Sequence, residues 1–278
     1  MNGYIDLHMH SSASDGTLTP TELAEECFRL NVKYCALTDH DTISGQEEFL
    51  SAAKRLGIKA VSGIEFNVAH PIELHILGYD FDIKNERFIS ALAGLGAERK
   101  KRAAAIVEKL VKSGYDISFE RVCGIAGDGV IGRPHIAMAL VEKGYVKDID
   151  HAFAELLDNG KPGYLKRKQY TPEEAIELIR SAGGKAVLAH PGCMEGEDHV
   201  ALLERLCACG LFGVEAFHSD HTDEQCEYFS ALAKRFGLFM TMGSDTHGSK
   251  YNEKFPGGEK RGIDKVAPTL KIFMNEVE

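Results

Sequence analysis

The segment Tyr4–Gly16 reads YIDLHMHSSASDG and joins an apolar strand pattern to a group of polar side chains. The run Tyr4–His8 is short, apolar and typical of a buried strand. His8 and His10 are residues i and i+2, which point to the same side of an extended chain. Asp15 follows five residues later. We therefore expect this strand to end with two imidazoles and a carboxylate close to one point.

Six further apolar runs, bounded by turn residues, predict the other strands. Helices with recognisable N-terminal caps lie between them and begin near Thr19, Ser44, Thr171 and Thr222. Strands that alternate with capped helices predict a parallel sheet. Seven strands over this length favour an α/β fold, a closed or distorted (β/α) barrel. The six runs are Tyr34–Thr38, Ala60–Ile64, Glu73–Tyr79, Lys185–Ala189, Gly213–Phe217 and Phe239–Gly243.

One region interrupts the alternation. Residues 83–168 contain no convincing strand, and three helices are expected there, at Glu86–Gly114, Pro134–Gly144 and Ile149–Gly160. We therefore predict that residues 1–82 and 169–278 form the barrel domain. Residues 83–168 are predicted to be an α-helical insertion subdomain between the fourth and fifth strands.

Composition excludes several classes of protein. The 278 residues carry a formal charge of −10, which argues against a broad basic surface for binding duplex nucleic acid. No run of about 18 apolar residues occurs, so no membrane span is expected. The N-terminus lacks the pattern of a signal peptide. Seven cysteines without zinc spacing indicate reduced thiols, so we expect a cytoplasmic protein, with a monomer as the default.

Side chains that bind metals collect where the predicted strands end. That rim is where (β/α) barrels carry their functional residues. Burying so many imidazoles and carboxylates together is costly unless cations compensate for the charge. Nine ligands suit two or three divalent ions, and a set without thiolate suits Zn²⁺, Mn²⁺ or Fe²⁺ better than Ca²⁺ or Mg²⁺. The candidates are His8, His10, Asp15, His40, Glu65, His75, His190, Asp245 and His247.

Five motifs in order carry a family resemblance: H-x-H…D, T-D-H-D, G-I-E, A-H-P and S-D-T-H. Together they resemble the PHP (polymerase and histidinol phosphatase) family over Tyr4–Tyr79 and Lys185–Gly248. The resemblance implies a distorted seven-stranded (β/α) barrel with a trinuclear metal site and phosphoesterase activity. The family's ligand pattern falls on the nine residues above. The His-Ile-Leu-Gly-Tyr context of this pattern selects His75 rather than the nearby His70.

The insertion and the motif Gly132–His135 resemble a subgroup of small nucleotide phosphatases. The subgroup acts on nucleoside monophosphates, on 3′,5′-bisphosphates, or on short oligoribonucleotides from the 5′ end. The resemblance implies that Arg133 and His135 contact phosphate, which a guanidinium can hold with two donors at once. His218 and His221 are expected to contact substrate. The catalytic residues that we expect are His8, His10, Arg133 and His218.

These residues predict hydrolysis of a phosphomonoester by a metal-activated water. Arg133 and His135 would hold phosphate oxygens, and His218 or His221 would give the leaving group its proton. Three alternatives stay open: a histidinol-phosphate-type phosphatase or an amide hydrolase on the same barrel, a metal-binding accessory domain without catalysis, and a nucleic-acid-binding module. Short single-stranded RNA is compatible with the predicted site.

Overall fold

A computed structural model gives the structure of the chain, and it describes residues 3–127, 131–166, 169–248 and 254–273. The chain divides into two compact units, residues 1–90 with 169–278, and residues 91–168. The sequence places the first boundary after residue 82, whereas the barrel unit continues to Ser90. The second predicted boundary, at Lys168, lies outside the described residues. The two units are described separately below.

The described residues of the barrel unit contain eight strands in two sheets, and because β3 and β4 are nearly continuous, they form a nearly closed barrel of seven strands. One sheet has the order β1-β2-β3 and the other the order β4-β5-β6-β7-β8. Bridges between Met9 and Thr246 and between His40 and Glu65 join the two sheets. Strands β3 and β4 follow one another, interrupted only at Ser62. The strands are β1 Tyr4–Asp6, β2 Val32–Ala36, β3 Lys59–Val61, β4 Gly63–Val68, β5 Leu74–Tyr79, β6 Lys185–Leu188, β7 Gly213–His218 and β8 Phe239–Gly243.

The predicted α/β barrel is confirmed, but the expected parallel sheet is wrong at one strand. Strand β5 runs antiparallel to both β4 and β6. Only residues 69–73 separate β4 from β5, too few for the crossover that parallel neighbours need. Because β5 is reversed, its first residues lie at the carboxyl end of β4, where Val68 pairs with Leu74. His75 therefore lies near the start of its strand and is still on the functional rim.

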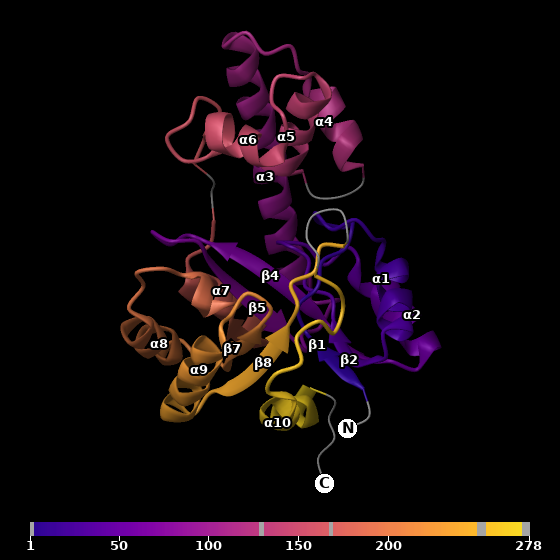
Figure 1. The fold of residues 1–278 in the computed structure, drawn as a ribbon, viewed down its shortest axis with the longest axis vertical. Helices are drawn as coiled ribbons and strands as arrows, with labels where there is room; N and C mark the ends of the chain where they lie inside the picture. The colour runs from indigo at the N-terminus through magenta and orange to yellow at the C-terminus, as the bar shows by residue number, and fades with distance from the viewer. Residues whose placement is uncertain (1–2, 128–130, 167–168, 249–253, 274–278) are drawn as a thin grey trace. The chain divides into compact units, whose positions relative to one another are not determined.

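Helices pack around the outside of the barrel unit (Figure 1). The capping boxes expected at Thr19, Thr171 and Thr222 are all present. The cap expected at Ser44 is wrong, because α2 begins after Gly45 without a side-chain cap. The helices of this unit are α1 Pro20–Arg29, α2 Gln46–Leu56, α7 Pro172–Ser181, η2 Pro191–Cys193, α8 His199–Ala208, α9 Asp223–Phe236 and α10 Ile263–Phe273.

In the insertion, all the regular secondary structure of the described residues is helical, and the unit has a hydrophobic core of its own. Leu110, Val122, Ile136, Leu140 and Leu157 are buried together in that core. The sequence did not predict α4, which Ser118 caps. The helices are α3 Glu86–Lys112, α4 Phe119–Ala126, α5 Arg133–Glu142, α6 Ile149–Ala152 and the π-helix η1 Phe153–Leu157.

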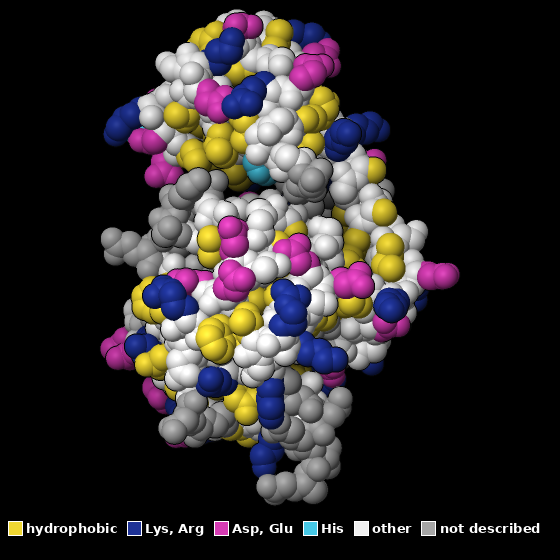
Figure 2. All heavy atoms as spheres, turned by 90° about the vertical axis from the view of Figure 1, so that its right-hand side faces the viewer, with side chains coloured by type: hydrophobic (Ala, Val, Ile, Leu, Met, Phe, Trp, Pro, Cys, Tyr) yellow, Lys and Arg dark blue, Asp and Glu magenta, His cyan; other side chains and the backbone are white. Residues whose placement is uncertain are grey.

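Two surface properties bear on the excluded classes of protein. Among the described helices, none is both long enough and apolar enough to cross a bilayer. On the face shown in Figure 2, acidic and basic side chains are interspersed and form no continuous basic stripe.

Gly243 closes the seam between the last and the first strand. Asp245 N donates a hydrogen bond to His8 O at 2.8 Å, two residues beyond β8. A Cβ at Gly243 would lie 2.2 Å from His8 Cβ and 2.9 Å from Glu215 Oε1. Real carbon atoms do not approach so closely, so only glycine fits between the two strands here.

We expect Gly243→Ala to lower the free energy of unfolding by about 1–3 kcal/mol, because the added methyl group must displace His8. Urea denaturation measures this change. The matched control is Gly94→Ala on the exposed side of α3, where a Cβ meets nothing within 4 Å. Alanine is the better helix former there, so the midpoint should stay or rise. Equal midpoints for Gly243→Ala and the unchanged protein would contradict this account of the seam.

Candidate active site

The structure brings all nine predicted metal ligands together at one rim of the barrel unit. His8 and His10 follow β1, His40 follows β2, and Glu65 lies inside β4 rather than at its end. His75 is the second residue of β5. The remaining ligands follow strands or neighbouring loops of the same rim, and they are Asp15, His190, Asp245 and His247.

Glu65 lies at the centre of this arrangement. Its side chain is 1% exposed, yet five histidine rings surround it. Oε2 lies 3.3 Å from both His8 Nε2 and His10 Nε2, and 2.9 Å from His40 Nδ1. The other oxygen, Oε1, lies 2.7 Å from His75 Nδ1 and 3.1 Å from His190 Nε2. Each oxygen of one buried carboxylate therefore faces a separate set of imidazoles.

Asp245 completes the group around the first two histidines. Its Oδ1 lies 3.1 Å from His10 Nε2 and 3.5 Å from His8 Nε2. With Glu65, these residues offer four ligand atoms within 4.8 Å of one another. Ligands about 2.0–2.2 Å from a shared metal ion stand about 3–3.5 Å apart, which matches this spacing.

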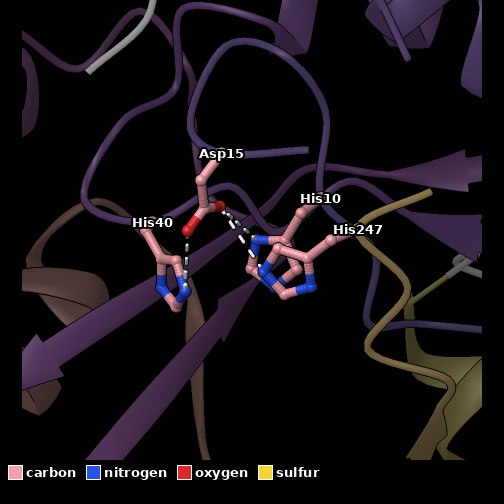
Figure 3. Close-up of side chains that lie close together, drawn as sticks. All are labelled: His10, Asp15, His40 and His247. Atoms are coloured by element: carbon pink, nitrogen blue, oxygen red, sulfur yellow. Dashed lines mark ion pairs between the residues drawn. The ribbon is translucent and has the colours of Figure 1, made fainter. Parts of the chain in front are cut away.

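A second group of four consists of Asp15 and three histidines around it (Figure 3). Asp15 Oδ1 lies 3.5 Å from His247 Nε2 and 4.0 Å from His10 Nδ1, while Oδ2 lies 3.9 Å from His40 Nε2. Figure 3 shows the carboxylate above the three rings, which turn toward it from separate segments. Burial and the nearby charge of His10 lower the pKa of His247 to about 4, so its ring is neutral and able to bind a metal.

Many buried polar atoms of the centre have no hydrogen-bond partner, although a buried polar group normally has one. Left without any partner, these atoms would together destabilise the fold by several kcal/mol. Cations at the centre would coordinate these nitrogen and oxygen atoms, so this set of ligand atoms fits divalent metals. The atoms are His8 Nε2, His10 Nδ1 and Nε2, His40 Nδ1, Glu65 Oε2, His75 Nε2 and His190 Nδ1.

The charges of the centre depend strongly on one another. Burial by itself lowers the pKa of His10, but Asp245 and Glu65 raise it overall to about 10. In the same way, Glu65 outweighs burial and raises the pKa of His75 to about 10. Without cations, these rings therefore hold protons near pH 7. A metal that binds here would replace those protons as the source of positive charge.

The backbone is strained at three residues of the rim. Asp41, His190 and Asp245 have φ angles of 53°, 23° and 53°, in the region that residues other than glycine rarely adopt. Such strain persists where the surrounding structure fixes it, and it is concentrated at functional sites. Two of the three residues, His190 and Asp245, are predicted ligands. The strained backbone at these two residues therefore sets the direction of ligand side chains.

The predicted site omitted Glu215, the third residue of β7. Its carboxylate is fully buried and lies 3.1 and 3.2 Å from His8 Nδ1. It also accepts a hydrogen bond from the backbone N–H of His190 at 2.8 Å. Although burial opposes ionisation, His8 lowers the pKa of Glu215 to about 2. In the sequence, Glu215 could have been recognised as a charged residue inside an otherwise apolar strand.

His218 and His221 follow different hydrogen-bonding patterns. Asp220 N donates to His218 Nδ1 at 3.2 Å, so the neutral ring carries its hydrogen on Nε2. That nitrogen is buried, lacks a hydrogen-bond partner and lies 3.8 Å from Asp245 Oδ2. His221 instead has both ring nitrogens engaged by backbone, at Gly192 N and Ala216 O. Substrate contact by His221 stays a prediction, and the structure gives this ring a role in holding the 191–193 turn.

Arg133 and His135 belong to the insertion unit, at the start of α5. His135 Nδ1 accepts a hydrogen bond from Gly132 N at 3.0 Å. Arg133 Nη1 donates to Leu157 O at 3.1 Å, and the guanidinium lies 5.1 Å from the ring centre of Phe153. Their contact with phosphate stays a prediction.

A cavity of about 210 Å³ opens onto the centre of the barrel unit. Its described lining residues come from several different strand ends and from η2. They are His40, Glu65, Glu73, His75, His190, Cys193, His218, Asp220, Asp245 and His247. A small molecule in this cavity would lie against Glu65 and Asp245.

The chain is similar to two curated bacterial proteins over most of its length. It is 37% identical to a 5′-3′ exoribonuclease of Haemophilus influenzae, covering 87% of this chain and 89% of the relative. It is 36% identical to a 3′,5′-nucleoside bisphosphate phosphatase of Chromobacterium violaceum, covering 99% and 96%.

The fold is shared with a solved structure, a predicted metal-dependent phosphoesterase of Bifidobacterium adolescentis. The TM-score is 0.86 at 31% identity, with 96% of each chain covered. The family model of the PHP domain matches residues 6–238. With its rim of histidines and carboxylates, the chain therefore belongs to the PHP domain family.

Proposed function

We propose that this protein is a metal-dependent phosphoesterase that hydrolyses phosphate from small nucleotides. The observation that carries the proposal is the buried carboxylate of Glu65, which has ring nitrogens of five histidines within 3.3 Å. Each of the five rings also has at least one buried nitrogen without a hydrogen-bond partner. The named relatives, a bisphosphate phosphatase and an exoribonuclease, support nucleotide substrates. The substrate is then a nucleoside 5′-monophosphate, a 3′,5′-bisphosphate or the 5′ end of a short oligoribonucleotide.

Two or three divalent ions would be held by the nine residues at the rim. His8, His10, Glu65 and Asp245 form one ligand group, and a second consists of His10, Asp15, His40 and His247. Glu65 and His75 also group with His40, and His190 lies beside them. Imidazole with carboxylate favours Zn²⁺, Mn²⁺ or Fe²⁺. When bound, such ions activate water and offset charge on phosphoryl oxygens.

The chain's own side chains orient the metal ligands and supply a hydrogen-bond donor. Glu215 accepts from His8 Nδ1–H, which fixes the tautomer and leaves the lone pair of Nε2 facing Glu65. Asp220 N–H occupies His218 Nδ1, so His218 presents Nε2–H beside Asp245. Because Nδ1 carries no hydrogen, loss of the Nε2 proton would leave an imidazolate, so His218 acts here as a hydrogen-bond donor to an oxygen of the bound phosphate ester rather than as its proton source. Arg133 and His135 are the further phosphate contacts that we infer from the sequence.

We also place the protein in the cytoplasm as a monomer. All seven cysteines are free thiols, as expected in a reducing compartment.

The test of function is a phosphate-release screen over nucleoside monophosphates, 3′,5′-bisphosphates and short RNAs, each with Mn²⁺, Zn²⁺ and Fe²⁺. We expect release from at least one of these classes, loss of activity with a chelator, and recovery when metal is restored. Histidinol phosphate is included as the competing substrate. Bound metal without hydrolysis of any compound would instead favour an accessory domain without catalysis.

We expect Glu215→Gln to weaken metal binding by about 10- to 100-fold, since the amide no longer fixes the His8 tautomer. Metal titration with competition by a chelator measures the change. The matched control is Glu197→Gln, which alters a Glu–His pair (Glu197 with His70, 2.9 Å) away from the nine ligands. Equal metal affinity of the two variants would remove Glu215 from this role.

We expect Arg133→Lys to raise KM by about tenfold and to change kcat less, because an ammonium cannot donate two parallel hydrogen bonds to phosphate. Steady-state kinetics on the best substrate of the screen measures both constants. Arg121→Lys is the control in the same unit, since Arg121 pairs with Glu142 through two hydrogen bonds. An unchanged KM for Arg133→Lys would rule out the phosphate contact.

A further inference from the structure

Lys254 is a cation at the edge of the centre that the ligand pattern does not include. Its Nζ lies 2.7 Å from Asp220 Oδ2 and 3.6 Å from Asp245 Oδ2. The side chain is only 17% exposed. Its backbone is anchored as well, because Thr246 Oγ1 donates a hydrogen bond to Lys254 O at 2.8 Å. The residue is therefore held beside the site by two separate contacts.

The two oxygens of Asp245 face different groups. Oδ1 is turned to His8 and His10, the side where we place a metal ion. Oδ2 is turned to Lys254 Nζ and to His218 Nε2, which lies 3.8 Å away. Two hydrogen-bond donors thus converge on the side of Asp245 that faces away from the paired histidines.

Both His218 Nε2 and Lys254 Nζ can donate a further hydrogen bond. His218 Nε2 is buried without a hydrogen-bond partner. An ammonium group has three N–H donors, and the described contacts of Lys254 Nζ are with Asp220 and, more distantly, Asp245. Asp220 is itself half exposed, so its ion pair with Lys254 is partly screened by water and can exchange for another anion.

A phosphate bound in the cavity needs a positively charged side chain beside it. Four of its described lining residues, Glu65, Glu73, Asp220 and Asp245, are acids, and none of the described lining residues is lysine or arginine. A phosphate that carries two charges would meet repulsion on the side where no cation is bound. Lys254 has a flexible four-carbon stem, so Nζ can leave Asp220 and reach an anion against this wall.

We propose that Lys254 Nζ and His218 Nε2 form a phosphate-binding subsite beside Asp245 in the barrel unit, with Asp220 holding the ammonium group until a phosphate replaces it. The proposal rests on the proposed function and deepens it. One phosphate oxygen accepts from His218 and another from Lys254. The barrel unit then recognises phosphate with its own residues, in addition to any contact from the insertion.

The direct test uses inorganic phosphate as the probe, with the metal-loaded protein in a calorimeter. We expect Lys254→Met to raise the Kd for phosphate by about 10- to 100-fold, as for loss of a charged hydrogen bond. Lys254→Arg should recover most of the affinity. The matched control is Lys265→Met, which removes a lysine paired with Glu227 on α9 and should leave the Kd unchanged.

Asp220→Asn gives a second test in the opposite direction. The amide competes less well for the ammonium group, so phosphate should bind several-fold more tightly. The backbone N–H of residue 220 still donates to His218, which keeps the ring tautomer. A purely structural role for Lys254, neutralising Asp220 and Asp245, predicts altered metal content in Lys254→Met with no change in phosphate Kd, and that result would overturn the proposal.

The two proposals can fail separately. Phosphate binding that depends on Lys254, in a protein that hydrolyses no nucleotide, would support the subsite and refute the proposed function. Normal nucleotide hydrolysis with an unchanged phosphate Kd in both Lys254→Met and Asp220→Asn would refute the subsite alone.

Discussion

The structure depends on one buried carboxylate, Glu65, placed among five imidazoles. A carboxylate excluded from water is stable only if positive charge surrounds it, and here that charge comes from protonated rings or from cations. The barrel supplies these rings from strand ends that are far apart in sequence. Their nitrogens lie too close to Glu65 to leave room for water, and each ring has at least one buried nitrogen without a hydrogen-bond partner. The site is therefore organised to hold cations before any substrate arrives.

The reversal of β5 is what makes this geometry possible. In a fully parallel barrel, a strand would present its last residues at the rim, whereas β5 presents its first. The short turn after β4 thus brings His75 to the same edge as Glu65, within 2.7 Å. The seam between β1 and β8 performs a similar task for His8 and Asp245, and Gly243 allows the approach.

Much of this could be read from the sequence, because the period of two along a strand places His8 and His10 on one side, and apolar runs mark where strands end. The direction of β5 could not be read, since periodicity carries no direction. Glu215 was missed because its partner, His8, is distant in sequence. Lys254 was missed because it lies in an irregular segment, where no pattern relates a lysine to Asp220. The partners of Arg133, likewise, became visible only in the folded insertion.

The positions of the ligands along the chain also have a consequence for biosynthesis. The centre needs side chains from residue 8 and from residue 247, so it cannot be assembled before β8 and the residues that follow it have been made. A product that stops before β8 lacks both the closing strand and Asp245, and it exposes the unpaired edge of β1. Binding of the proposed metal ions is thus tied to formation of β8, and a chain cut before β8 is left with an unpaired strand edge that proteases or other chains can reach.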